Sequence, residues 1–305
     1  MKNINLFFFF LFMLISCKCE ITKNVLTIDD RTEDIRKQIA VDNNIPIDDI
    51  IYFGSDIIIH TSLQKVNLTA LKTAHDLSVL QIEGPAFKIS DIFLSDKPIV
   101  LRIYKTHGEN FDFSPLCNNT SLTYLLLRNI SYEDIETMPV MHSISVVSLE
   151  LNKDTQLTLS FLAKIFPNIR AILLCNISLG DLENKYSHSM AEALLPFPKL
   201  KNISFKGRTD ENTISILYNE NINKLSFQDS VVDLSAAVFQ KITYIKSLTF
   251  VKSEIKNTRF FFNEEINNCD YLLIIDSVLI EQDKPDIDVK YFWGNAKDFF
   301  VTYLK

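Results

Sequence analysis

The sequence predicts an α/β solenoid, in which successive coils of the chain stack and each coil contributes one short strand to a parallel sheet. The main observation is a spacing of three apolar residues, separated first by two free positions and then by one, that recurs nine times between Leu77 and Ser277. Successive units begin 21 to 31 residues apart, an interval typical of solenoid repeats. The units begin at Leu77, Pro98, Leu122, Ile144, Ile169, Leu200, Ile222, Ile245 and Cys269.

A second spacing concerns the segments that return the chain from one strand to the next. Six units have a further apolar residue three positions before their start: Ala74, Met141, Phe166, Phe197, Ile242 and Ile266. Steps of three residues suit a short helix or a 3-10 turn on the convex side of a solenoid. The alternative is a β-sandwich, but such a fold shows alternating runs joined by tight turns and has no reason to keep a near-constant interval.

This unit resembles the leucine-rich repeat, whose pattern is L-x-x-L-x-L-x-x-N/C-x-L. The resemblance covers roughly residues 77–280 and implies an irregular horseshoe with a parallel concave sheet, short helical or 3-10 convex segments, and a cap at each end. Where the family has Asn or Cys, five units carry Thr106, Asn152, Ser230, Ser253 and Ser277. The other four carry Pro85, Ile130, Ile177 and Arg208. We therefore expect distorted coils, especially in the long unit from Ile169 to Lys199.

The chain is expected to divide into four parts. These are an export signal at 1–19, an N-terminal cap with a degenerate first repeat at 20–76, the repeats at 77–280, and a C-terminal cap at 281–305. Coils at the ends of a solenoid need such covers because an isolated coil cannot bury its apolar stripe.

The N-terminal cap is expected to begin with a helix. Asp29 and Asp30 are suited to cap a helix over 31–41, in which Ile35, Ile39 and Val41 are available for packing. Strand-like runs occur at 50–53 and 57–60, and the degenerate repeat is placed at 66–71.

The C-terminal cap concentrates aromatic residues. They form either a closing cap or an exposed binding patch. They are Tyr291, Phe292, Trp293, Phe299, Phe300 and Tyr303.

The N-terminus predicts export. Leu6 to Ile15 is an unbroken apolar run of ten residues, which is too short to span a membrane because a span needs about 20. Two processing schemes stay open. Cleavage before Glu20 gives a secreted protein, whereas Leu14–Cys17 resembles a lipobox and gives a chain of which residues 1–16 are removed and Cys17 is lipidated. The second scheme attaches the protein to a bacterial outer surface, and a lipid on Cys17 is the only membrane attachment expected.

Sequons for N-linked glycans are frequent, and in a eukaryotic secretory protein several are expected to be occupied. They lie at Asn67, Asn118, Asn119, Asn129, Asn176 and Asn202. Past residue 19 only Cys117, Cys175 and Cys269 remain, and an odd, widely spaced set does not make a disulfide framework. Cys269 occupies an apolar repeat position, so we expect it to be a small buried residue.

The concave face is the expected binding surface. Side chains alternate along a strand, so the free positions of each unit point away from the core when the apolar ones point into it. Tyr and Arg are enriched at binding hot spots. The predicted contact patch is therefore Arg102, Tyr104, Tyr124, Arg128 and Glu150. A simpler explanation of the same residues is that a solvent-facing sheet needs polar side chains.

The sequence gives no support for catalysis or for a cofactor. A net charge of −7 argues against a nucleic-acid partner. The five histidines show no metal-ligand spacing, and no nucleotide-binding or nucleophile motif occurs. The sequence thus predicts an exported, non-enzymatic binding protein without cofactor or metal that recognises a protein or glycan. The alternative is a structural or self-assembling surface protein.

Overall fold

The structure is a computed structural model. It describes residues 30–53, 55–63, 66–74, 77–85, 100–107, 111–114, 116, 119–151, 159–175, 199–207, 222–236, 239, 242, 244–262, 268–281 and 285–304. The expected export signal with Cys17, and the sequons at Asn118 and Asn176, lie outside these residues.

The architecture is a β-solenoid built on one 14-stranded sheet. Along the main path the order is β1-β2-β3-β4-β5-β6-β7-β8-β9-β11-β13-β12-β10, and β14 pairs with β13. The first strands are β1 (Ile50–Phe53), β2 (Asp56–His60), β3 (Val79–Gly84), β4 (Val100–Lys105), β5 (Tyr124–Ile130), β6 (Val146–Leu151) and β7 (Ala171–Cys175). The rest are β8 (Asn202–Lys206), β9 (Lys224–Gln228), β10 (Val231–Asp233), β11 (Ile245–Val251), β12 (Glu254–Lys256), β13 (Cys269–Ile280) and β14 (Ile287–Gly294).

All nine predicted units contribute a strand, and the strands pair in parallel with the predicted register. The second apolar position of each unit lies beside that of the next, as in Leu80 opposite Leu101 and Leu248 opposite Leu272. These side chains are almost fully buried, so each coil buries its apolar stripe against its neighbours. The prediction of a solenoid with a parallel sheet is confirmed.

Aromatic packing strengthens the core of the later coils. Phe205 stacks on Phe227 with ring centroids 5.3 Å apart, and Phe227 stacks on Phe250 at 5.5 Å. The third apolar position of these units holds all three rings, so the in-register pairing of β8, β9 and β11 brings the rings face to face. Such pairs add about 0.5–1.5 kcal/mol each beyond the burial of their area.

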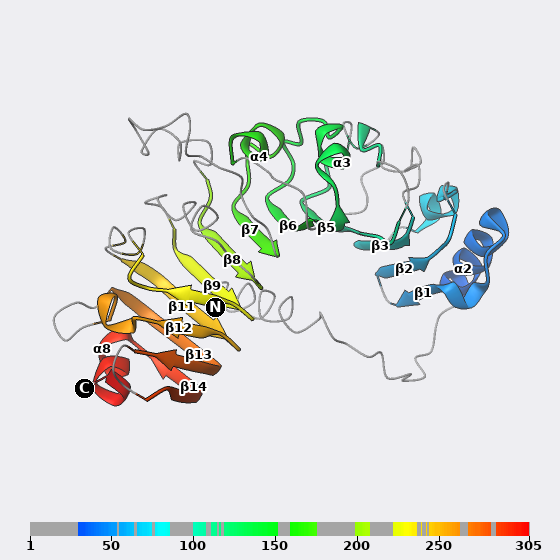
Figure 1. Ribbon diagram of the computed structural model, residues 1–305. Helices are drawn as coiled ribbons and strands as arrows, with labels where there is room; N and C mark the ends of the chain where they lie inside the picture. The colour runs from blue at the N-terminus through cyan, green and yellow to red at the C-terminus, as the bar shows by residue number, and fades with distance from the viewer. Residues whose placement is uncertain are drawn as a thin grey trace.

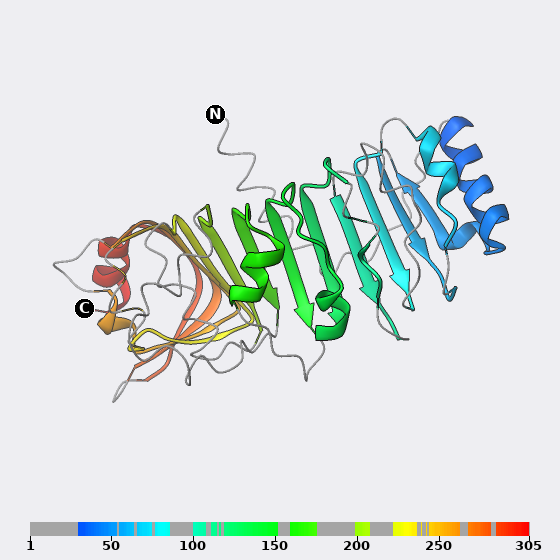
Figure 2. The same cartoon turned by 90° about the horizontal axis from the view of Figure 1, so that it is seen from above.

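The sheet bends into an arch, and the helices lie on its outer side (Figure 1). Viewed from above, the strands lie side by side from α2 to the C-terminal end (Figure 2). The convex segments include η3 (Thr69–Thr73), α3 (Tyr132–Glu136), α4 (Leu159–Ile165) and η7 (Thr258–Phe260). Ala74, Met141 and Phe166 are buried there, as the three-residue spacing predicts, whereas Phe197 and Ile266 lie outside the described residues. Within the described ranges, no helix is both long enough and apolar enough to cross a membrane.

Helix α2 (Asp30–Asn43) covers the first strand of the sheet. Ile35 and Ile39 are buried, as predicted, but Val41 is 74% exposed because it faces away from the sheet. Arg36 joins the helix to the start of the sheet. Its Nε donates to the carbonyl of Ile50 at 2.8 Å, and its Nη2 donates to that of Ile47, in the 3-10 turn η2 (Ile47–Asp49), at 3.0 Å.

The strand-like runs expected at 50–53 and 57–60 form β1 and β2, and β2 is the strand that precedes the nine units. β1 and β2 form an antiparallel hairpin, and β2 pairs in parallel with β3, with Ile57 opposite Leu80. Residues 66–71, where the sequence places a degenerate repeat, form no strand and instead lead into the 3-10 helix η3. The turn between β1 and β2 lies outside the repeat. The repeat spacing therefore gives no information about the register in which β2 pairs with β3.

The C-terminal aromatic residues divide between the two predicted roles. Strand β14 is followed by α8 (Ala296–Phe299) and η8 (Phe300–Leu304). Phe299 is fully buried and meets Phe262 and Phe292 edge-on, with centroids 5.2 and 5.1 Å away. Tyr291 and Trp293, in contrast, are 64% and 49% exposed. The group closes the core and also leaves two aromatic side chains at the surface.

A column of serines replaces part of the asparagine ladder that the family resemblance implies. The backbone N–H of Ser230 donates to Ser253 Oγ at 3.3 Å, and that of Ser253 donates to Ser277 Oγ at 3.1 Å. Each hydroxyl also donates to the carbonyl two residues earlier, at 2.8–2.9 Å. These bonds tie three coils together where the chain turns from the main sheet into β10, β12 and the second half of β13. In these three coils, serine therefore makes bonds between coils at the position where the family pattern has Asn or Cys.

The turn into this column uses left-handed backbone. We call the position where the family pattern has Asn or Cys the ladder position. The residue before it has positive φ in five units: Asn129 (55°), Gly207 (77°), Asp229 (50°), Lys252 (49°) and Asp276 (46°). In the unit with Ile130 at the ladder position, the pairing of β5 with β6 shifts register between Arg128 and Ile130, which is the distortion expected there. The Nδ2 of Asn129 donates to the carbonyl of Lys105 at 2.8 Å, so the residue before the ladder position makes the bond between coils.

Candidate binding surface

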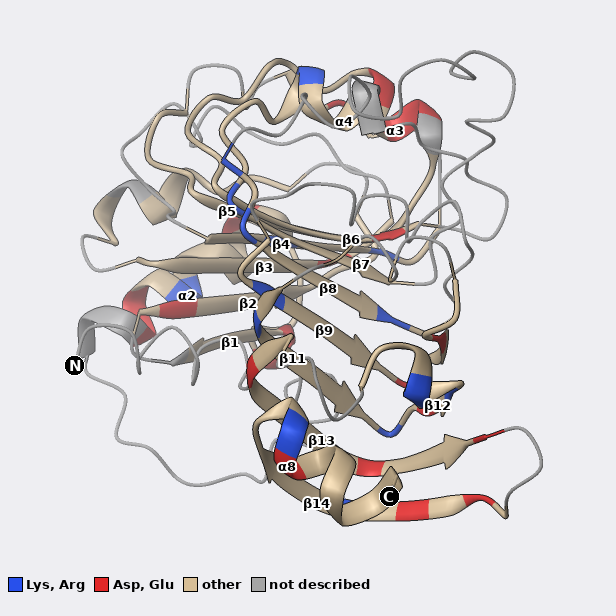
Figure 3. Ribbon diagram, turned by 90° about the vertical axis from the view of Figure 1, so that its left-hand side faces the viewer, with Lys and Arg blue, Asp and Glu red and all other residues tan. Residues whose placement is uncertain are grey.

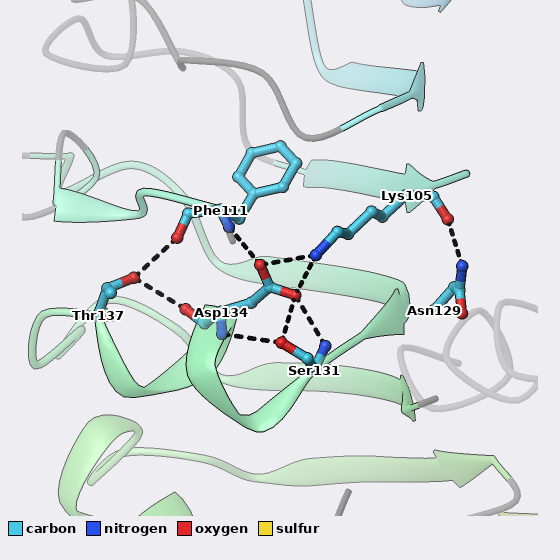
Figure 4. Close-up of polar contacts among 6 residues, drawn as sticks. All are labelled: Lys105, Phe111, Asn129, Ser131, Asp134 and Thr137. Atoms are coloured by element: carbon cyan, nitrogen blue, oxygen red, sulfur yellow. Dashed lines mark hydrogen bonds and ion pairs between the residues drawn. The ribbon is translucent and has the colours of Figure 1, made fainter. Parts of the chain in front are cut away.

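A buried ionic cluster holds the ends of β4 and β5 (Figure 4). Lys105 Nζ donates to Asp134 Oδ1 at 3.0 Å and to Oδ2 at 2.8 Å, and the two side chains are 8% and 0% exposed. Asp134 also accepts from the backbone N–H groups of Phe111 and Ser131 and from the Ser131 hydroxyl. A buried ion pair is tolerated when its remaining hydrogen-bonding capacity is used, as it is here.

The local sequence explains why Asp134 lies at this place. Ser131 is the N-cap of α3 and Asp134 is its N3 residue, so the two form a capping box. The same carboxylate that caps the helix then reaches Lys105, which lies 29 residues earlier in the chain. Lys105 directly follows Tyr104, and Asn129, which bonds the Lys105 carbonyl, directly follows Arg128. The cluster therefore fixes the two strand ends that carry two of the predicted contact residues.

Three predicted contact residues lie in one row across the sheet. Tyr104, Arg128 and Glu150 are direct neighbours on β4, β5 and β6. The guanidinium of Arg128 lies over the ring of Tyr104, 4.8 Å from its centroid, and its Nε is 3.1 Å from Glu150 Oε2. The side chains of Arg128 and Glu150 are 31% and 37% exposed. Arg128 is thus held from both sides while it remains accessible to solvent.

The row continues toward the N-terminus in residues that the predicted patch does not include. His60 on β2 lies beside Glu83 on β3, with His60 Nδ1 3.2 Å from Glu83 Oε2, and Glu83 lies opposite Tyr104. Both side chains are more than 40% exposed. The sequence already marks 57–60 as strand-like, but the pairing of β2 with β3 is what gives His60 the same position as Glu83. We define the concave row as His60, Glu83, Tyr104, Arg128 and Glu150.

Arg102 and Tyr124 behave differently from the concave row. Arg102 lies two residues before Tyr104 on the same face of β4, and its buried Nε has no hydrogen-bond partner among the described residues. Tyr124 is on the predicted face but is only 3% exposed, and this burial raises the pKa of its hydroxyl. Alternation along a strand predicts the face but not the depth of a side chain, so Tyr124 supports its neighbours instead of forming an exposed contact.

The four described sequons differ in accessibility. Asn67 and Asn129 are exposed, and Asn202 is half-buried on β8. Asn119 is 4% exposed, and its Oδ1 accepts from the N–H groups of Ser121 and Leu122. Glycan occupancy stays a prediction, for which Asn67 and Asn129 are the most accessible of these positions.

Both cysteines of the described chain are buried thiols. Cys175 and Cys269 form no disulfide, and Cys117 lies outside the described residues. Burial, with the charge of Asp270 added, raises the pKa of Cys269 to about 12, so its thiolate is not populated at neutral pH. The prediction that Cys269 is a small buried residue is confirmed. No group of three or more metal-ligating side chains gathers anywhere in the part of the chain that the structure describes.

Comparison with known proteins gives a fold likeness only. No family model matches the chain, and no curated protein matches it. Among solved structures, it is similar to the crystal structure of an internalin from Listeria monocytogenes, with a TM-score of 0.47 and 14% sequence identity. The match covers 82% of this chain and 70% of that one. A likeness this weak carries no information about partners, so the functional conclusion rests on the geometry of the concave row.

Proposed function

We propose that this chain is an exported, non-enzymatic binding protein that recognises another protein through the concave face of its solenoid. The observation that carries the proposal is Arg128, which lies over the Tyr104 ring and beside the Glu150 carboxylate on a rigid parallel sheet. Binding orders exposed side chains at a cost of about 0.5–1.5 kcal/mol each. A side chain already held in place loses less freedom, so the same contact gives more affinity.

The charges of the concave row favour a protein over a polyanion. Acidic and basic residues alternate along it, with Glu83 and Glu150 on either side of Arg128. Figure 3 likewise shows basic and acidic positions interspersed over the strands. A polyanion needs clustered cations, whereas mixed charges match a protein surface of complementary pattern and give it orientation.

Export is the second part of the proposal and rests on the apolar run at Leu6–Ile15. The intact mass of the protein made by its native cell tests it. A chain starting at Glu20 supports secretion, and a diacylglycerol adduct on Cys17 supports the lipid-anchored alternative. Retention of residues 1–19 in a cytoplasmic protein would contradict both.

Site-specific photo-crosslinking tests the binding face. A photoreactive residue at Gln81, on the concave side of β3, is compared with one at Glu136, which is exposed in α3 on the outer side. We expect a protein to be captured from Gln81 and not from Glu136. That capture should fall at least tenfold in Arg128→Ala but not in the matched control Arg170→Ala, which removes an exposed arginine just before β7. Equal capture from both faces would sink the proposal.

A further inference from the structure

The β1 edge of the sheet and its β14 edge are protected to very different degrees. At one end, α2 packs on β1, and Arg36 hydrogen-bonds carbonyls at Ile47 and Ile50. At the other end, β14 pairs only with β13, and no other described element lies beyond it (Figure 1). Helix α8 and η8 pack on a face of β14, where Phe299 and Tyr303 meet the ring of Phe292. An edge strand of eight residues with no described element beyond it is a template for another strand.

The residues of β14 are self-complementary in one antiparallel register. If two copies of the strand pair about a twofold axis at Val289, Asp288 of each copy lies opposite Lys290 of the other. Both side chains are exposed, and each symmetric pairing then contains two such ion pairs. Opposite charges at directly facing positions favour a strand pair, and like charges oppose it.

The same register also places apolar groups together. Tyr291, which is 64% exposed, comes opposite Ile287 of the second copy, and the twofold axis repeats this contact. Pairs of an aromatic with a β-branched residue are among the favourable cross-strand pairs. Trp293, which is 49% exposed, lies on the same face two residues further along and extends the apolar area.

We propose that β14 is a homodimer interface, at which a second copy of this chain adds its own β14 antiparallel and continues the sheet. The interface is closed and isologous, because the same residues meet on both sides of the axis. Its site lies at the opposite end of the sheet from His60 and Glu83, so it leaves the concave row open in each copy.

A charge-exchange series tests the register. The purified full chain is followed by sedimentation velocity from micromolar to millimolar concentration, and we expect a monomer–dimer equilibrium. Lys290→Glu places two carboxylates opposite each other in each pair, and Asp288→Lys places two ammonium groups there. Each single change should weaken dimerisation by about tenfold. The double variant Asp288→Lys with Lys290→Glu should restore it. Lys297→Glu, the same charge change at an exposed position of α8, is the matched control and should have no effect.

Three results would overturn the proposal. The first is a chain that stays monomeric over the whole concentration range. The second is a dimer that Lys290→Glu leaves unchanged, as expected for association through the apolar run at residues 6–15 or for a lysine that only protects the edge. The third is a double variant that stays as weak as the single ones. None of these results bears on the concave row, which the crosslinking from Gln81 tests separately.

Discussion

The early and late coils of this solenoid secure the same turn in different ways. Around β4 and β5, the chain uses a buried ion pair between Lys105 and Asp134, with Asn129 bonding the neighbouring carbonyl. Around β9, β11 and β13, it uses the neutral hydroxyl column of Ser230, Ser253 and Ser277. The buried ion pair costs free energy because both charges lose their hydration, and it needs both partners to be present. The serine column instead repeats one small hydrogen bond in each coil.

The strands next to the ion pair and those next to the serine column also differ in the side chains they present. The ionic cluster directly follows Tyr104 and Arg128, so the part of the sheet with the strongest buried restraint is also the part that presents the concave row. The serine column follows strands whose core is made of stacked phenylalanines. The comparison suggests that the early coils are restrained for recognition and the late coils for packing, and each half of this view can be tested.

The largest effect is expected from Asp134→Ala. The change leaves the Lys105 ammonium buried without its partner and removes the side-chain half of the capping box of α3, so we expect a loss of about 3–5 kcal/mol in the free energy of unfolding. Urea denaturation measures it. The pair replacement Lys105→Met with Asp134→Leu should recover only part of the loss, because it leaves no buried charge but still leaves the Phe111 and Ser131 N–H groups without their acceptor. If the single variant cost less than about 1 kcal/mol, the early coils would not depend on the ion pair.

A smaller effect is expected from Ser253→Ala in the middle of the serine column. It removes the acceptor for the Ser230 N–H and one donor, and should cost about 1–3 kcal/mol in the same assay. Ser114→Ala, the same change at an exposed position, is the control. A cost equal to that of Asp134→Ala would remove the contrast between the two regions.

The concave row should contribute little to stability. A double-mutant cycle of Arg128→Ala and Glu150→Ala should give a coupling of about 0.2–1 kcal/mol, because both side chains are a third exposed and solvent screens the pair. The same single changes should weaken capture of a partner from Gln81 at least tenfold. A coupling of several kcal/mol without any change in capture would assign the row to folding instead of recognition.

The smallest effect is a pH dependence in the late coils. Burial alone would raise the pKa of Asp233, but hydrogen bonds from Ser235 and Asn257 lower it below the usual value. A carboxyl with a lowered pKa in the folded state stabilises the fold above its unfolded pKa of about 3.9, and the contribution is lost as pH falls through the lower folded value. Asp233→Asn should therefore flatten the dependence of the melting temperature on pH below about 4. An unchanged profile would contradict this assignment.

The register of the nine strands was predictable because one spacing fixes both the period and the face of each residue. Tyr104, Arg128 and Glu150 came together for that reason. The burial of Tyr124 was not predictable. Alternation along a strand gives the face on which a side chain lies, but its exposed fraction depends on the side chains of the neighbouring strands. The strand-like run at 57–60 was also predictable, but its pairing with β3 was not, because β2 belongs to a hairpin outside the repeat. The pairing of Lys105 with Asp134 joins two coils through a helix cap and leaves no periodic signal in the sequence.

The left-handed residues before the ladder positions have a consequence for protein design. Lys252 adopts φ 49° without the short polar side chain that eases this conformation at Asn129, Asp229 and Asp276. A bulky residue there stores roughly 1 kcal/mol of backbone strain. Replacement of Lys252 by asparagine or glycine is therefore a route to a more heat-resistant scaffold, because it alters neither the concave face nor the hydrophobic spine.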